Sequence, residues 1–114
     1  MKKFNQYGFT IHCRDYISNR EFDMILREIN KQKIDITSNI VVQDLMPLFS
    51  ELSTPLKSFV RKVEDEEGNK IEVDIEELPA NVMFHVKMYM FECFQGFANE
   101  LEDVKAEKKA PETN

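Results

Sequence analysis

The residues with the most specific chemistry in this chain are two histidines and two cysteines, namely His12, Cys13, His85 and Cys93. A nucleophilic thiol needs a histidine within hydrogen-bond reach, whereas His85 and Cys93 would lie ~12 Å apart along one predicted helix. Pairing of Cys13 with His85 stays open, although no third group that would orient the histidine can be named. A zinc site is not expected, because His12 and Cys13 point to opposite faces of a predicted strand and no metal-ligand spacing occurs. The sequence therefore predicts buried, inert thiols and no metal or other cofactor.

Carboxylates form the second group of reactive side chains, and they are concentrated in one stretch. Eight acidic residues and one basic residue, Lys70, lie in residues 64–77, so this stretch carries −7. The whole chain carries −6, so the remaining residues sum to −6 − (−7) = +1. Acid–base catalysis needs a carboxyl group in a dry pocket, whereas a charged hairpin is solvated. We therefore expect no enzyme, and a small hydrolase without a recognisable motif is the remaining catalytic alternative.

The charge distribution also bears on partners. No basic stripe is visible, so direct contact with nucleic acid is not expected. The three glycines, Gly8, Gly68 and Gly96, are too widely spaced to build a phosphate-binding loop. The acidic stretch would suit an inhibitor that mimics nucleic acid and occupies a site on a basic protein. This alternative assigns the function to an acidic patch of Glu64, Asp65, Glu66, Glu67, Glu72 and Asp74.

Two elements are predicted in the N-terminal third of the chain. Apolar and polar residues alternate over residues 7–13, which predicts a half-buried strand with Cys13 on its apolar face. Ser18 and Glu21 have the spacing of a capping box, in which each side chain bonds the backbone amide of the other residue. Apolar residues then recur at helical spacing, which predicts a helix from Asn19 to Gln32 whose buried face holds Phe22, Ile25, Leu26 and Ile29.

The middle of the chain has weaker patterns. Ile34, Ile36 and the run over 40–42 favour two short strands or one bent strand. Asp44 has the chemistry of a helix cap and predicts a short helix over residues 45–52. Segments 58–64 and 70–75 flank a turn-forming sequence at 65–69 and predict a β-hairpin. A second helix over residues 56–63 is the competing interpretation.

The most informative segment is a predicted helix over residues 80–104, which would be ~37 Å long. Its apolar arc spans ~200°, against the ~100° that a surface helix needs to cover a core. One ridge of this arc holds Val82, Val86, Met90, Cys93, Phe97, Leu101 and Val104. A second ridge holds Phe84, Met88 and Phe91, with Lys87 between the two ridges. Either both ridges are buried, or the second ridge faces a partner, for which methionines flanked by aromatic residues are suited.

The chain has 114 residues, of which 42% are hydrophobic and 32% charged, and this suits one globular domain. The fold class expected is α+β: a small, mainly antiparallel sheet with a β-hairpin, packed by an N-terminal capped helix and a long C-terminal helix. Residues 1–104 would form the single domain, and residues 105–114 a disordered polar tail. No signal peptide or membrane-length apolar run is found, which favours a cytoplasmic protein without membrane contact.

In size, acidity and apolar helix the chain resembles small accessory proteins such as phage assembly factors and secretion chaperones. The resemblance implies a non-catalytic module that binds another protein, or a second copy of itself, through the C-terminal helix. Phe84, Lys87, Met88 and Phe91 are the expected partner-binding residues. The nucleic-acid mimic described above is the alternative function.

Overall fold

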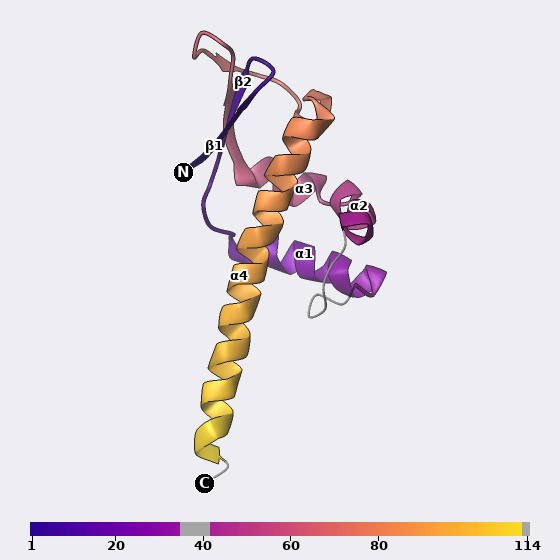
Figure 1. Cartoon of the computed structure of the whole chain (residues 1–114), viewed down its shortest axis with the longest axis vertical. Coiled ribbons are helices and arrows are strands. Elements are labelled where there is room, and N and C mark those ends of the chain that lie inside the picture. The colour runs from indigo at the N-terminus through magenta and orange to yellow at the C-terminus, as the bar shows by residue number, and fades with distance from the viewer. Residues whose placement is uncertain (35–41, 113–114) are drawn as a thin grey trace.

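The computed structural model of the chain describes residues 1–34 and 42–112 (Figure 1). These residues form a four-stranded antiparallel sheet, four α-helices and one short 3-10 helix, which confirms the α+β class. The strands expected between residues 34 and 42 lie outside the described residues, except for Ile34, which belongs to no element, and Val42, which is helical.

The sheet contains β1 (Lys2–Gln6), β2 (Phe9–Cys13), β3 (Val60–Glu64) and β4 (Lys70–Ile71), in that order. The strand predicted over residues 7–13 is wrong at its start, because Tyr7 and Gly8 form a tight turn with φ angles of 54° and 78°. Two successive positive φ angles suit a two-residue hairpin turn, and Gly8 adopts one without steric cost. Strand β1 was not predicted, since Phe4 is its single apolar residue and no alternation marks it.

One face of the sheet supplies part of the core. The register aligns Phe4, Ile11, Val63 and Ile71 across the four strands, and Ile11 and Val63 are buried. This face packs against helix α4 (Ala80–Glu112), where the ring centroid of Tyr89 lies 5.9 Å from that of Phe4. The opposite face is polar, as the alternation in β2 predicts.

Helix α1 (Asn19–Gln32) has the predicted bounds and the predicted capping box. The Glu21 amide donates to the Ser18 hydroxyl at 3.2 Å, and the Ser18 amide donates to the Glu21 carboxylate at 2.8 Å. At the C-terminal end, Lys33 adopts a left-handed conformation with φ of 57°, and its amide donates to backbone carbonyls of the last turn. A side-chain capping box therefore sets the N-terminal end of α1, and a left-handed backbone cap closes its C-terminal end.

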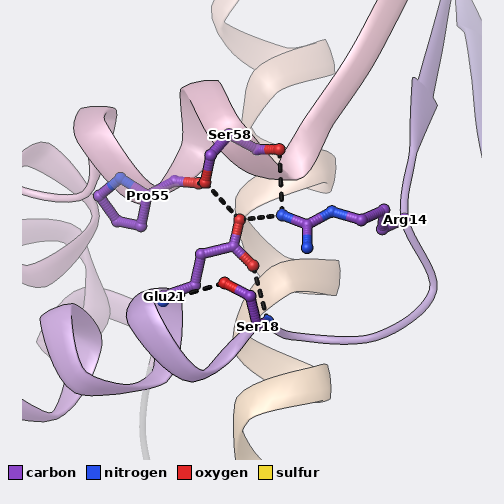
Figure 2. A network of polar contacts seen from close by, with 5 residues as sticks. All are labelled: Arg14, Ser18, Glu21, Pro55 and Ser58. Carbon is purple, nitrogen blue, oxygen red and sulfur yellow. Dashed lines mark hydrogen bonds and ion pairs between the residues drawn. The ribbon is translucent and has the colours of Figure 1, made fainter.

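A buried carboxylate joins α1 to the rest of the molecule. The side chain of Glu21 is 1% exposed, and one of its oxygens accepts hydrogen bonds from Arg14 and from the Ser58 hydroxyl (Figure 2). Arg14 also donates to the Ser58 carbonyl oxygen at 3.0 Å, and the Pro55 carbonyl oxygen lies 3.1 Å from the Ser58 hydroxyl. A buried charge is tolerated when it is paired and hydrogen-bonded. This network fixes the N-terminus of α1 against the end of α3 (Ser53–Phe59).

Helix α2 (Val42–Ser50) and α3 differ from the sequence predictions. The helix expected over 45–52 is wrong at both ends, because α2 begins at Val42 and ends at Ser50. Asp44 is therefore a helical residue and not the cap. Pro47 lies inside α2, where its missing N–H removes one helical hydrogen bond. The two interpretations of residues 56–63 are each partly right: the chain is helical to Phe59 and then enters β3, which pairs with β4 in the expected hairpin.

Helix α4 runs along most of the molecule, which measures 62 × 26 × 21 Å (Figure 1). Its backbone stays helical beyond the expected end at Val104 and continues to Glu112. The N-terminal part of α4 supplies much of the core, with buried side chains at Val82, Val86, Met90, Phe91 and Phe94. No helix within residues 1–34 or 42–112 combines the length and the apolar character that crossing a membrane requires.

Candidate binding groove

A groove of about 260 Å³ opens where α2, η1 (Ile75–Glu77) and the first turns of α4 meet. Its lining includes Met46, Phe49, Ile75, Met83, Phe84 and Lys87, and we refer to it as the α2–α4 groove. Because these residues come from three separate elements, the groove depends on how those elements pack.

Two local features bring η1 and α4 to this place. The Asp74 carboxylate accepts a hydrogen bond from the Glu76 amide at 3.0 Å and so starts η1. Pro79 precedes α4, and its carbonyl oxygen accepts the Met83 amide at 3.1 Å. A proline suits the start of a helix because a backbone N–H there would have no acceptor within the helix. These two features place η1 directly before α4 in the chain, and α2 completes the lining of the groove.

The floor of the groove is apolar. Phe49, Ile75 and Met83 are buried, with exposed fractions of 3%, 8% and 5%. Phe49 packs edge-on against Phe84, with ring centroids 6.1 Å apart at an interplanar angle of 61°. Met46 stands at the rim with 53% of its surface exposed. The groove thus offers apolar surface to the solvent above a buried apolar floor.

Of the four residues expected to bind a partner, Phe84 and Lys87 line the α2–α4 groove. Both are half-buried, and among the described residues Lys87 makes no ion pair. Met88 is half-buried beside the core and does not line the groove. The structure therefore places two of the four predicted residues, Phe84 and Lys87, together at the groove.

The prediction that Phe91 faces a partner is corrected by the structure. Phe91 is 2% exposed, and its ring centroid lies 6.2 Å from that of Phe49 and 5.9 Å from that of Phe94. The reason is that α2 covers the second ridge of α4, so the wide apolar arc is shared between the sheet on one side and α2 on the other. Phe91 is a core residue, and the second ridge is not one exposed surface.

The acidic patch is largely engaged within the chain. Glu64 accepts a hydrogen bond from His12 and lies 3.9 Å from Lys62 Nζ. Asp65 accepts the amides of Glu67 and Asn69, both at 2.9 Å, and so closes its own turn. Asp74 starts η1, as described above. Glu67 accepts a hydrogen bond from the Asn69 side-chain amide at 3.4 Å. Among the predicted acidic residues, Glu66 and Glu72 remain as exposed carboxylates without such a bond in the described residues.

Basic residues lie beside the acidic patch. A shallow hollow of about 450 Å³ along β3 and β4 is lined by Glu72 and Asp74 together with four cations, Lys57, Arg61, Lys62 and Lys70. The negative charge of residues 64–77 is therefore partly balanced on this side of the molecule.

The remaining residues with specific chemistry do not form a catalytic group. Burial raises the pKa of the Cys13 thiol to about 12 and also raises the pKa of the Cys93 thiol, so both favour the protonated form. His12 is 4% exposed, and its ring is hydrogen-bonded to Glu64 of the neighbouring strand β3. The hydrogen bond from His12 is the main cause that lowers the pKa of Glu64. Within residues 1–34 and 42–112, no three His, Cys, Asp or Glu side chains gather as metal ligands.

Sequence reasoning missed the groove residues on α2 and η1, namely Met46, Phe49, Ile75 and Glu76. The run from Met46 to Phe49 could have indicated this site, because an exposed methionine lies there next to large apolar residues in a short helix. Its position opposite Phe84 depends on tertiary packing. Comparison with known proteins finds no matching family model, no similar curated protein and no similar solved structure.

Proposed function

We propose that this chain is a non-catalytic protein-binding module of the small assembly-factor or chaperone type. In this proposal the α2–α4 groove receives an apolar side chain of the partner. The observation that carries the proposal is the exposed Met46 above a buried apolar floor formed by Phe49 and Met83. Water leaves such a surface favourably when a partner covers it.

The size of the groove favours a side chain over a small molecule. Pockets for small ligands usually have volumes of roughly 300–1,000 Å³, and the α2–α4 groove has about 260 Å³. A volume of this size suits one or two apolar side chains of a partner segment. The two methionines that line it, Met46 and Met83, have flexible side chains that adapt to differently shaped anchors.

Charge at the groove defines the partner further. Lys87 stands on the α4 wall and makes no ion pair within the part of the chain that the structure describes. A half-buried ammonium group gains from a carboxylate brought by the partner. We therefore expect a partner segment with an apolar anchor and an acidic residue close to it.

The alternative function, a nucleic-acid mimic, has less support. Glu64, Asp65 and Asp74 already accept hydrogen bonds within the chain, and Lys57, Arg61, Lys62 and Lys70 lie next to Glu72. A mimic of a phosphate backbone needs an uninterrupted negative surface. The proposal includes a cytoplasmic setting, which the free thiols of Cys13 and Cys93 support.

The proposal is tested by selecting a displayed library of random short peptides on the full chain and titrating the enriched peptides into protein labelled at the methionine methyl groups. We expect enriched peptides to carry a large apolar residue with a neighbouring acidic residue. Their binding should shift the methyl resonances of Met46 and Met83, whereas Met24, which lines another part of the surface, should not move. Met46→Lys should weaken binding at least tenfold, which corresponds to ~1.4 kcal/mol.

Leu101→Lys is the matched control. Leu101 is also a large exposed apolar residue, at 40%, but it lies on the distal part of α4 outside the groove. This variant should bind the peptides as the wild type does. Enriched peptides that bind Met46→Lys with unchanged affinity, or a selection without apolar enrichment, would contradict the proposal.

A further inference from the structure

The shallow hollow along β3 and β4, which we refer to as the β3–β4 hollow, lies next to the α2–α4 groove. The two share Ile75 as a lining residue. Helix α3 contributes to both, because Leu56 lines the groove and the next residue, Lys57, lines the hollow. A partner segment that extends from the groove past Ile75 therefore enters the β3–β4 hollow.

Four exposed cations line the β3–β4 hollow, namely Lys57, Arg61, Lys62 and Lys70. Lys62 lies 3.9 Å from a Glu64 oxygen, whereas the other three cations make no ion pair within the described residues. Eight acidic residues occur in residues 64–77, yet none of them lies within ion-pair distance of these three cations. The hollow therefore offers positive charge that the described part of the chain does not neutralise by direct contact.

A β-bulge explains why neighbouring cations gather in this hollow. Lys62 pairs with His12 of β2. The next pair along β2 joins Cys13 to Val60, so Arg61 is an extra residue on β3. In a regular strand Arg61 and Lys62 would point to opposite faces of the sheet, whereas a bulge disrupts this alternation and redirects a side chain. Both residues line the same hollow.

The rest of the lining restricts the kind of ligand. Glu72 and Asp74 also line the hollow, so the positive surface is interrupted and does not suit a continuous phosphate backbone. No aromatic ring on which a base could stack is found among the described residues that line it. The four cations are exposed, whereas a pocket for a small molecule usually buries most of its ligand. Separate carboxylates along a peptide therefore fit this surface best.

We propose that the β3–β4 hollow binds a run of acidic residues in the same partner segment whose apolar side chain anchors in the α2–α4 groove. The inference rests on the proposed function, because the groove supplies the anchor. The carboxylates of the run meet Lys57, Arg61 and Lys70, while Val60 and the exposed Val73 contact the methylene groups of the acidic side chains. The partner is thus a protein with an apolar residue next to an acidic run.

The test compares two capped peptides, each titrated into the full chain and followed through the backbone amide resonances. One peptide has a phenylalanine flanked on both sides by glutamates, and the other has glutamines in their place. The chain as a whole carries −6 and repels an acidic peptide, so a preference for glutamates must come from a local group of cations. Exposed ion pairs are individually weak, so we expect several of them to give a preference of about tenfold at low ionic strength. The amides of Lys57, Arg61 and Lys70 should shift with the glutamate peptide.

Charge reversal in the hollow should remove this preference. Lys57→Glu combined with Arg61→Glu should reduce it to less than about threefold. Arg20→Glu combined with Lys31→Glu is the matched control, since it changes the net charge by the same amount at exposed residues of α1 that line neither the hollow nor the groove. The control should keep the preference. A wild type that binds both peptides equally, a hollow variant that keeps the preference, or a control that loses it overturns the inference.

Met46→Ser separates this inference from the groove proposal, because it removes an apolar groove residue without changing the charge. It should weaken the binding of both peptides and leave the ratio of their affinities unchanged. Unchanged affinities in Met46→Ser would refute the groove and leave the binding of the acidic run by the hollow standing. A single-stranded DNA oligonucleotide that binds the hollow more tightly than the glutamate peptide would overturn the assignment to a protein partner.

Discussion

Replacing Glu21 by alanine tests whether the buried network at the start of α1 stabilises the fold beyond its helix cap. The carboxylate is 1% exposed and accepts hydrogen bonds from the Ser18 amide, from Arg14 and from the Ser58 hydroxyl. Removing one member of a buried ion pair usually costs ~3–5 kcal/mol, because the other charge is left without a partner. Arg14 is 14% exposed and keeps the Ser58 carbonyl oxygen at 3.0 Å, so the lower end of this range applies. We expect Glu21→Ala to lower the free energy of unfolding by ~3 kcal/mol.

The assay is urea denaturation followed by circular dichroism, with two comparison variants. Ser18→Ala removes the cap alone and should cost ~1 kcal/mol. Asp23→Ala removes an exposed carboxylate from the same helix and should change the stability by less than about 0.5 kcal/mol. A domain of this size has a total stability of ~5–15 kcal/mol, so a loss of ~3 kcal/mol is measurable without complete unfolding.

A double-mutant cycle with Arg14→Met then separates the ion pair from the rest of the network. The double variant Arg14→Met with Glu21→Ala should be less destabilised than the sum of the two single variants, because neither charge is left unpaired. If Glu21→Ala costs no more than Ser18→Ala, the carboxylate acts only within the cap, and the reasoning about the buried pair is wrong.

Three further predictions concern the core, the first hairpin and the polar face of the sheet. Phe91→Ala should lower the free energy of unfolding by ~3–5 kcal/mol in urea denaturation, because the ring is 2% exposed and packs on two other aromatic rings. An unchanged urea midpoint would contradict the assignment of Phe91 to the core. Gly8→Ala should cost ~1–2 kcal/mol in thermal melting, because Gly8 has φ of +78° and a Cβ there would lie 2.6 Å from the Glu66 carboxylate; no loss would mean that the turn relaxes. The hydrogen bond from His12 lowers the pKa of Glu64 in the folded chain below its ordinary value of 4.5. The contribution of this pair to the free energy of unfolding is therefore fully present above pH 4.5, and it is lost as the pH falls through the lowered pKa of the folded state. Glu64→Gln should flatten this part of the pH dependence of urea unfolding, and an unchanged profile would show that the pair does not contribute.

The sequence predicts best where one short segment determines its own structure. The start of α1 was predicted because Ser18 and Glu21 satisfy each other's backbone amides without help from the rest of the chain. Strand β1 was missed because Phe4 alone cannot show an alternation, and its place at the sheet edge depends on pairing with β2. The sequence thus predicts structure that neighbouring residues determine, and it does not predict which strands pair.

The candidate groove shows the same limit. The apolar arc of α4 was readable from the sequence, but which part of it would be covered depended on α2, a helix of different bounds from those expected. Phe91 therefore lies in the core and Phe84 at the groove, although both belong to the same ridge. Met46 could be assigned to the site only once its helix was placed opposite α4.

The pairing of β2 with β3 has a consequence for how fast the chain folds. Each outer pair, β1 with β2 and β3 with β4, is joined by a short turn, so each hairpin closes on a timescale of ~1–10 µs. The central pair aligns Ile11 with Val63, and α1, α2 and α3 all lie between them in the chain. Closing that long segment costs entropy before any contact across the pair is gained. We expect the β2–β3 contacts to form after the folding transition state. Val60→Ala, at a residue that pairs with Cys13 of β2 and not with β4, should therefore speed unfolding more than it slows refolding in stopped-flow measurements.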